Sequence, residues 1–259
     1  MTYRTAPRAL ATATAALLAL GGVTACSTDD SPAAPEPDRI DVVAGFYPLQ
    51  FLAEQVGGDA VTVTNLARPG AHPHDLELNP GQVGQISEAG LVIFLHGFQP
   101  AVDEAVDQNA GDRAFDVATV EPLLDAAAGG HTHSHGDDDH GHEDDDHGHD
   151  HADEEKPAEE TSDGTKDPHV WLDPTRLATI GDKLAERLGA VAPDRAGEFS
   201  QRAATLRTEL EKLDTEFTEG LKTCQRREIV VSHTAFGYLA QKYELEQIGI
   251  TGLSPEDER

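Results

Sequence analysis

Short apolar runs rich in β-branched residues alternate with helical patterns in this chain, and this alternation constrains the fold more than any other feature. Three early runs have the length of a strand: Ile40–Ala44, Val61–Leu66 and Leu91–Leu95. Helices are predicted between and after them: Leu49–Val56, Gly81–Ala89 and about Ala101–Asn109. Strands and helices in turn predict parallel βαβ units with helices on both faces of a sheet. Ligands of such sheets bind beyond the carboxyl ends of the strands.

The second half of the chain continues this pattern after two longer helices. Asp173 as N-cap and Pro174 at the first helical position predict a helix through Leu188. A helix over Arg195–Leu221 is predicted from one apolar stripe at three- and four-residue steps, namely Phe199, Ala203, Leu206, Leu210, Leu213, Phe217 and Leu221. We interpret it as a rod between two lobes of a monomer, with a coiled-coil dimer seam as the alternative.

New βα elements follow the rod: a strand Ile229–Ser232, a helix Phe236–Tyr243 and a strand Leu245–Ile250. Two strands and one helix cannot bury a core of their own, so this second lobe is expected to be incomplete and the chain a fragment. The predicted domains are a first α/β lobe at 40–190, a linker helix at 194–224 and the start of a second α/β lobe at 228–259.

The N-terminus has the features of an export signal. Arg4 and Arg8 precede an uncharged run from Ala9 to Val23, which is short for a membrane span and typical of a signal peptide. Residues 23–26, Val-Thr-Ala-Cys, resemble a bacterial lipobox, which predicts a signal peptide at 1–25 and lipidation of Cys26. Residues 26–39 are interpreted as a flexible tether. The protein is then extracytoplasmic and held at the cell membrane by acyl chains; a simple cleaved signal or an uncleaved anchor is the alternative.

The charge and composition of the chain limit the classes of molecule that it is expected to bind. The formal net charge is −29, from 48 acidic and 19 basic side chains. This excess argues against nucleic acid and anionic membrane surfaces, and it suits a secreted protein that handles cations. Much of it lies in the segment 131–163, which has no apolar periodicity and is predicted to be a disordered insert. Its eight histidines predict several weak zinc sites rather than one defined site, with a solvated acidic linker as the alternative: His131, His133, His135, His140, His142, His147, His149 and His151.

Three of the five remaining histidines stand where an α/β sheet presents ligands. His74 follows the strand 61–66, His233 follows the strand 229–232, and His169 precedes a helix with Asp167 and Asp173 nearby. Either carboxylate is a candidate to accept the second ring N–H of a ligating imidazole. Three neutral imidazoles form a donor set that suits Zn²⁺. The other two histidines, at 72 and 96, are weaker candidates, and a surface or hydrogen-bonded histidine is the alternative at each of the five positions.

Three segments resemble a known family. They are Pro-Gly-Ala-His-Pro-His-Asp-Leu-Glu at 69–77, Asp-Pro-His-Val-Trp-Leu-Asp-Pro at 167–174 and Ser-His-Thr-Ala-Phe-Gly-Tyr at 232–238. From about Ile40 to its end, outside the insert, the chain resembles the metal-binding lipoproteins and periplasmic proteins of ABC importers for zinc and manganese (cluster A-I, or family 9, solute-binding proteins). The resemblance implies two Rossmann-like α/β lobes joined by one long helix, with a single metal in the cleft.

The resemblance also implies the ligands. His74 and His169 match the ligands of the first lobe, and His233 matches the first ligand of the second lobe. Histidine at that third position goes with zinc in the family, and an acidic residue goes with manganese. His72 stands where the family usually has an acidic residue, so it is a possible additional ligand. The family's acidic fourth ligand would lie beyond Arg259, where similar proteins also suggest a disulfide partner for Cys224.

The leading hypothesis is an extracytoplasmic high-affinity zinc receptor that delivers Zn²⁺ to an ABC permease without catalysing a reaction. A His-rich zinc buffer or chaperone, an adhesion lipoprotein and a manganese receptor are alternatives. Three histidines around zinc with an open fourth position also occur in zinc hydrolases. Asp75 and Asp173 are candidate acid–base residues by adjacency alone, so an enzyme is not expected.

Overall fold

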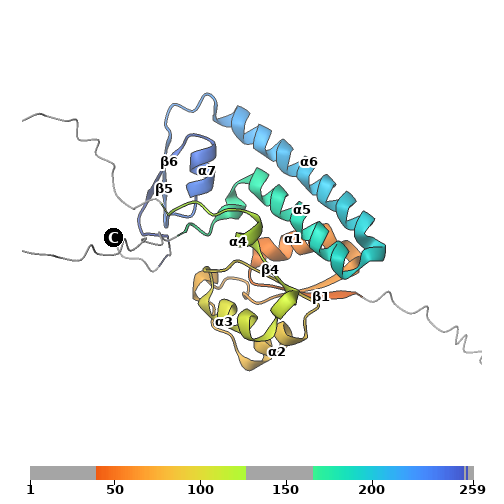
Figure 1. Cartoon of the computed structure of the whole chain (residues 1–259). Helices are drawn as coiled ribbons and strands as arrows, with labels where there is room; N and C mark the ends of the chain where they lie inside the picture. The colour runs from red at the N-terminus through yellow and green to blue at the C-terminus, as the bar shows by residue number, and fades with distance from the viewer. Residues whose placement is uncertain (1–38, 127–165, 254, 256–259) are drawn as a thin grey trace, which may run out of the picture. The chain divides into compact units, whose positions relative to one another are not determined.

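The computed structural model describes residues 39–126, 166–253 and 255 (Figure 1). The predicted signal peptide, the lipidation site Cys26, nearly all of the tether and the insert 131–163 with its eight histidines lie outside the described residues. Within the described ranges, no helix has the length and apolar character needed to cross a membrane.

Four strands form a parallel sheet in the first lobe. They are β1 (Ile40–Ala44), β2 (Val61–Asn65), β3 (Leu91–Phe94) and β4 (Ala114–Asp116), in the order β2-β1-β3-β4. β1 and β2 pair from Ile40 opposite Val61 to Ala44 opposite Asn65. The first three strands lie where the apolar runs predict them, and the three-residue β4 is an addition that the sequence pattern does not indicate.

Helices cover both faces of this sheet, as predicted. One helix follows each of the four strands: α1 (Tyr47–Gly57), α2 (Pro80–Glu88), α3 (Pro100–Asn109) and α4 (Val117–Val120). Alternate residues of β1 face opposite ways, because Val42 packs in the core with α1 whereas Val43 packs in the core with α2 and α3. Figure 1 shows α2 and α3 on one side of the sheet and α1, α5 and α6 on the other. Short 3₁₀ helices complete the chain: Gly58–Ala60, Pro73–Asp75, Gly111–Arg113, Val170–Leu172 and Pro193–Arg195.

Two long helices follow the gap in the described chain. α5 spans Pro174–Val191, and the side chain of Asp173 accepts hydrogen bonds from the main-chain N–H groups of Thr175 and Arg176, which confirms the predicted N-cap. α6 spans Ala196–Leu221 and packs along α5. Its part up to Leu210 buries four stripe residues in the core of the first lobe: Phe199, Ala203, Leu206 and Leu210. Beyond them Leu213 is 40% exposed, so the predicted stripe does not stay buried over its whole length.

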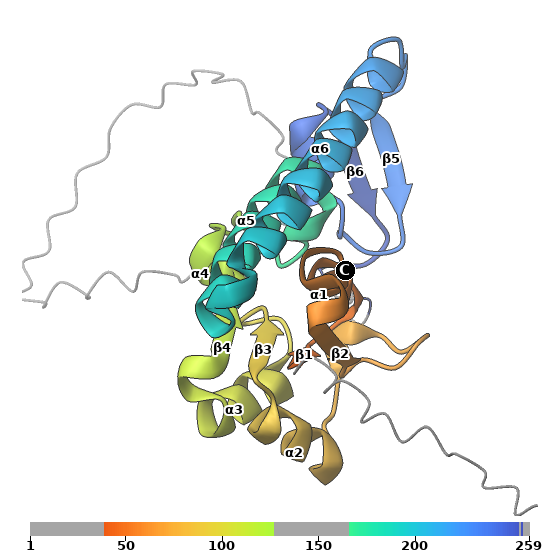
Figure 2. The same ribbon diagram turned by 90° about the vertical axis from the view of Figure 1, so that its right-hand side faces the viewer.

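The last elements form a small parallel unit, β5 (Glu228–Val231), α7 (Gly237–Lys242) and β6 (Glu246–Gly249). It lies beside the C-terminal half of α6 (Figure 2). The ring of Tyr243 stacks on that of Phe217 of α6, with centroids 5.2 Å apart. One face of its sheet is exposed, since Val230 and Ile248 pair across the strands and are 71% and 42% exposed. The parallel sheets and the long helix confirm the α/β fold class.

Candidate metal centre

His74, His169 and His233 converge on one point. Each offers one ring nitrogen, and these atoms all lie within 4.8 Å of one another. The Nε2 atoms of His74 and His169 are 3.3 Å apart, and the ring of His233 lies 5.4 Å from that of His169 between centroids. His74 comes from the 3₁₀ turn after β2, His169 precedes the turn before α5, and His233 follows β5. Loops at strand ends and a turn before a helix therefore bring the three residues together.

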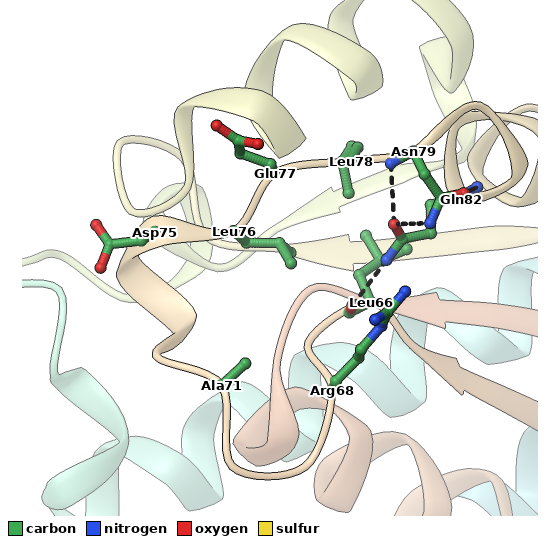
Figure 3. A pocket seen from close by; sticks show the side chains of 9 residues that line it. All are labelled: Leu66, Arg68, Ala71, Asp75, Leu76, Glu77, Leu78, Asn79 and Gln82. Carbon is green, nitrogen blue, oxygen red and sulfur yellow. Dashed lines mark hydrogen bonds between the residues drawn. The ribbon is translucent and has the colours of Figure 1, made fainter.

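The segment that carries His74 is fastened at its base and near its tip. At the base, the side chain of Gln82 donates to the carbonyl of Leu66 at 2.9 Å and accepts from the N–H of Asn79 at 3.0 Å (Figure 3). The residues of this loop line an open pocket of about 370 Å³ that none of the three histidines lines. Near the tip, Gln99 donates from Nε2 to the carbonyl of Pro73 at 2.8 Å and to that of Gly45 at 3.4 Å.

Gln99 is a functional candidate that the sequence pattern does not reveal. Its side chain is 1% exposed, and it links the turn of His74 to the end of β1. Buried polar groups are usually hydrogen-bonded, and here two main-chain carbonyls accept from the side-chain NH2 group. The adjacent Phe98 packs its ring 4.6 Å from that of His74. The residues after β3 therefore hold His74 from two directions.

His169 is the most buried of the three histidines, with 2% of its surface exposed. One oxygen of Asp167, Oδ1, lies 2.8 Å from its ring Nδ1 and also accepts its main-chain N–H at 2.9 Å. A carboxylate at Nδ1 favours the tautomer that carries the proton there, which leaves the Nε2 lone pair directed at His74. Of the two carboxylates expected to serve this purpose, Asp167 does so. Asp173 instead caps α5 and lies 3.3 Å from Nζ of Lys242.

His233 is held by the main chain of the small unit. The N–H of Thr251 donates to the carbonyl of Ser232 at 2.9 Å, and the N–H of Thr234 donates to that of Gly252 at 2.7 Å. The residues on both sides of His233 are thus tied to the segment after β6. These backbone hydrogen bonds fix the main chain on both sides of His233.

Aromatic side chains form one wall of the site. The ring of Trp171 lies 5.3 Å from His169 and 5.6 Å from Phe98, and Phe46 packs on both Phe98 and Trp171. An apolar wall limits water access and lowers the local dielectric, which strengthens the attraction between a cation and its ligands.

The two weaker candidates lie apart from this group. His72 is exposed and does not join the three converging histidines. His96 is 60% exposed, and its Nδ1 lies 3.8 Å from a carboxylate oxygen of Asp103. Neither side chain contributes to the arrangement that the structure describes, and a role of His72 as an additional ligand stays a prediction.

Three neutral nitrogen donors favour a borderline-soft cation over Mg²⁺, Ca²⁺ or Mn²⁺, which prefer oxygen ligands. Zn²⁺ is bound by imidazole at about 2.0–2.1 Å with tetrahedral geometry, so a fourth position is needed for water or a further ligand. The nitrogen atoms, which lie no more than 4.8 Å apart, suit such a geometry after small side-chain movements.

Comparison with known sequences identifies the family. Residues 42–259 match the profile described as "Zinc-uptake complex component A periplasmic", ZnuA. The chain belongs to the ZnuA family. Two curated relatives have names that agree with this assignment. The zinc-binding lipoprotein AdcA of Streptococcus pneumoniae is 30% identical over 225 residues, which cover 85% of this chain and 40% of that protein. The high-affinity zinc uptake system protein ZnuA of Bacillus subtilis is 29% identical over 238 residues, which cover 91% of this chain and 69% of that protein.

A solved structure of the family is also similar. Zn(II)-bound AdcA from Streptococcus pneumoniae matches with a TM-score of 0.64 and 26% identity, over 84% of this chain and 40% of that chain. The chain thus spans about two fifths of the length of its streptococcal relatives.

Proposed function

We propose that this chain is a zinc receptor that captures Zn²⁺ outside the cytoplasmic membrane and passes it to an ABC importer. The observation that carries the proposal is the convergence of His74, His169 and His233, with one ring nitrogen of each within 4.8 Å of the others. Binding is reversible and involves no chemical reaction, in keeping with relatives that are named for zinc binding and zinc uptake. The cargo contacts the three imidazoles directly, and a fourth donor completes the tetrahedron.

The proposal extends to location and partner. Lipidation at Cys26 would hold the protein at the outer face of the membrane, in agreement with the lipoprotein name of one relative. The importer's permease would receive the ion from a site formed between two α/β lobes, the first at 40–190 and the second starting at 228, with 194–224 as the linker helix. Zinc is favoured over manganese because the donor set is nitrogen alone.

A zinc buffer is the second candidate, because eight histidines crowd the segment 131–151. The two functions differ in what survives deletion of residues 131–163. Asp125 and Lys166 form an antiparallel bridge at the edge of this segment, so the deletion retains the pairing that joins its two ends. A receptor keeps one tight zinc equivalent after the deletion, whereas a buffer loses nearly all of its binding.

The test is a competition titration of Zn²⁺ into the mature protein without residues 131–163, with Mn²⁺ in parallel. We expect one tight zinc equivalent that manganese barely displaces. His169→Ala should weaken it by more than the about 10–100-fold typical of losing an outer-shell partner. His96→Ala is the matched control, since His96 is exposed and outside the group, and it should leave the affinity unchanged. Equal affinity in both variants would contradict the proposed site.

A further inference from the structure

Tyr238 occupies the junction between the small C-terminal unit and the first lobe. It lies in the first turn of α7 and is 1% exposed. Its hydroxyl donates to the main-chain carbonyl of Asp167 at 2.7 Å and accepts from the main-chain N–H of Leu124 at 2.8 Å. These two segments also pair with each other, because the N–H of Asp167 donates to the carbonyl of Leu124 at 2.9 Å. One phenol therefore binds both strands of this pairing to α7.

The helix also contacts the side chain of Asp167. A Cβ atom added to Gly237 would lie 2.4 Å from Oδ2 of Asp167, so only glycine permits the observed approach of α7. The other oxygen of the same carboxylate holds His169 through both its ring Nδ1 and its main-chain N–H. The carboxylate thus lies between the first turn of α7 and an imidazole of the candidate metal centre.

We propose that Tyr238 is a positioning residue for metal capture, which fixes α7 on the main chain of Asp167 and so sets the orientation of His169 together with the docking of the unit that carries His233. The inference rests on the proposed function. Two ligands come from the first lobe and the third from the small unit, so correct ligand geometry requires that the unit dock in one place. Asp167 takes part in both: its main-chain carbonyl accepts the hydrogen bond from Tyr238 that docks the unit, and its carboxylate orients His169.

Other contacts of α7 provide a matched control. Nζ of Lys242 donates to Oγ1 of Thr175 at 2.8 Å, and the hydroxyl of Tyr243 lies 2.9 Å from Oδ1 of Asp214 on α6. Both contacts hold the helix without touching Asp167. Tyr243 is 7% exposed, so Tyr243→Phe and Tyr238→Phe each remove one buried hydroxyl from the same region. They differ in whether the lost hydrogen bonds reach the partner of His169.

The experiment measures Zn²⁺ affinity by competition, and the visible absorption of bound Co²⁺, in the chain without residues 131–163. Tyr238→Phe should weaken zinc binding about tenfold, at the lower end of outer-shell effects, and change the Co²⁺ absorption envelope. Tyr243→Phe should leave both unchanged, even if it lowers the melting temperature. Equal effects of the two variants on affinity and spectrum, or no effect of Tyr238→Phe, would overturn the inference. Failure of the unsubstituted chain to bind zinc would instead overturn the proposed function.

A second substitution perturbs the same contact from the other side. Gly237→Ala places a methyl group against Oδ2 of Asp167, so we expect weaker zinc binding and an altered Co²⁺ spectrum. Gly84→Ala is its control, because Gly84 lies in α2 with nothing within 4 Å of an added Cβ. Wild-type affinity in Gly237→Ala would count against the inference even if the phenylalanine variant supported it.

Discussion

The Nε2 atoms of His74 and His169 lie 3.3 Å apart, although 95 residues separate them in the sequence. Asp167 accepts at Nδ1 of His169, so the N–H···N contact between the rings is made with His74 as the donor and His169 as the acceptor. A bound cation would need both lone pairs. His74 must therefore carry its proton on Nδ1 instead of Nε2 when a cation is bound, which is a change of tautomer without net loss of a proton.

Zinc binding should weaken as the pH falls from about 7.5 to 5, because protons compete with the metal for imidazole nitrogen and only the neutral form ligates a metal. Competition titrations at constant ionic strength check this. The variant without residues 131–163 is the one to use, since the histidines of the insert would also compete for zinc and for protons. An affinity that stays constant across this range would contradict ligation by imidazole.

Asp167→Asn should weaken zinc binding by about 10–100-fold. The substitution removes the charge that orients His169 and allows the amide to present a donor instead of an acceptor to ring Nδ1. Asp125→Asn is a suitable control, because the exposed Asp125 lies at the paired ends near this site and bonds to Lys166. Isothermal titration calorimetry or dye competition on both variants separates the effect of the carboxylate that contacts His169 from a general effect of negative charge nearby.

Gln99→Glu should destabilise the protein by about 1–3 kcal/mol and lower zinc affinity. The new carboxylate would face the carbonyl oxygens of Pro73 and Gly45, which lose their donor and gain a repulsive neighbour. Gln108→Glu makes the same change at an exposed position of α3. Denaturant unfolding and zinc titration of the two variants test whether the hydrogen bonds of Gln99 support His74. Equal stability and equal zinc affinity of the two variants would mean that they do not.

Alkaline pH should destabilise the fold through Tyr238. Burial raises the pKa of Tyr238 to about 12, whereas an unfolded tyrosine titrates near about 10. The folded state holds the proton more tightly, so this contribution to stability is complete below pH 10 and is lost as the pH rises through about 12. The free energy of unfolding should fall by at most about 1.4 kcal/mol per pH unit from this proton.

Tyr238→Phe should therefore make the pH dependence of unfolding shallower over this range. Tyr47→Phe serves as the control, because Tyr47 is 65% exposed. Denaturant unfolding at several alkaline pH values measures the slope, and identical slopes for the two variants would exclude Tyr238 as a source of it.

The parts of the fold that are specified locally are the parts that the sequence predicts. β1 occupies the predicted residues Ile40–Ala44 because a strand of this kind has its own apolar run, and the Asp173-Pro174 pair marks the start of α5 through chemistry within one turn. β4 and α4 have three and four residues, too few to produce a periodicity. Leu213 belongs to the predicted stripe by its spacing, but it is exposed because the hydrophobic core of the first lobe ends at Leu210, and the spacing does not show where that core ends.

The same division applies to the candidate site. The positions of His74 and His233 after strands are readable because parallel sheets gather loops at one edge. Gln99 and Tyr238 are not readable, since their partners lie 26 and 71 residues away or more, and no local pattern marks a buried amide or phenol. The sequence identifies Asp173 as a helix cap, but it leaves both Asp167 and Asp173 as candidate partners of a ligating imidazole, and only the structure shows that Asp167 is the one that contacts His169.

The pairing of Asp125 with Lys166, reinforced by the hydrogen bond between Asp167 and Leu124, has a consequence for protein engineering. Chain ends that are already held together make the stability of the lobe nearly independent of what connects them, because each doubling of loop length adds only about 0.6 kcal/mol of closure entropy. A reporter domain or a foreign peptide could replace the natural sequence between these residues. Such a cassette would end close in sequence to His169 and so would lie next to the candidate metal centre.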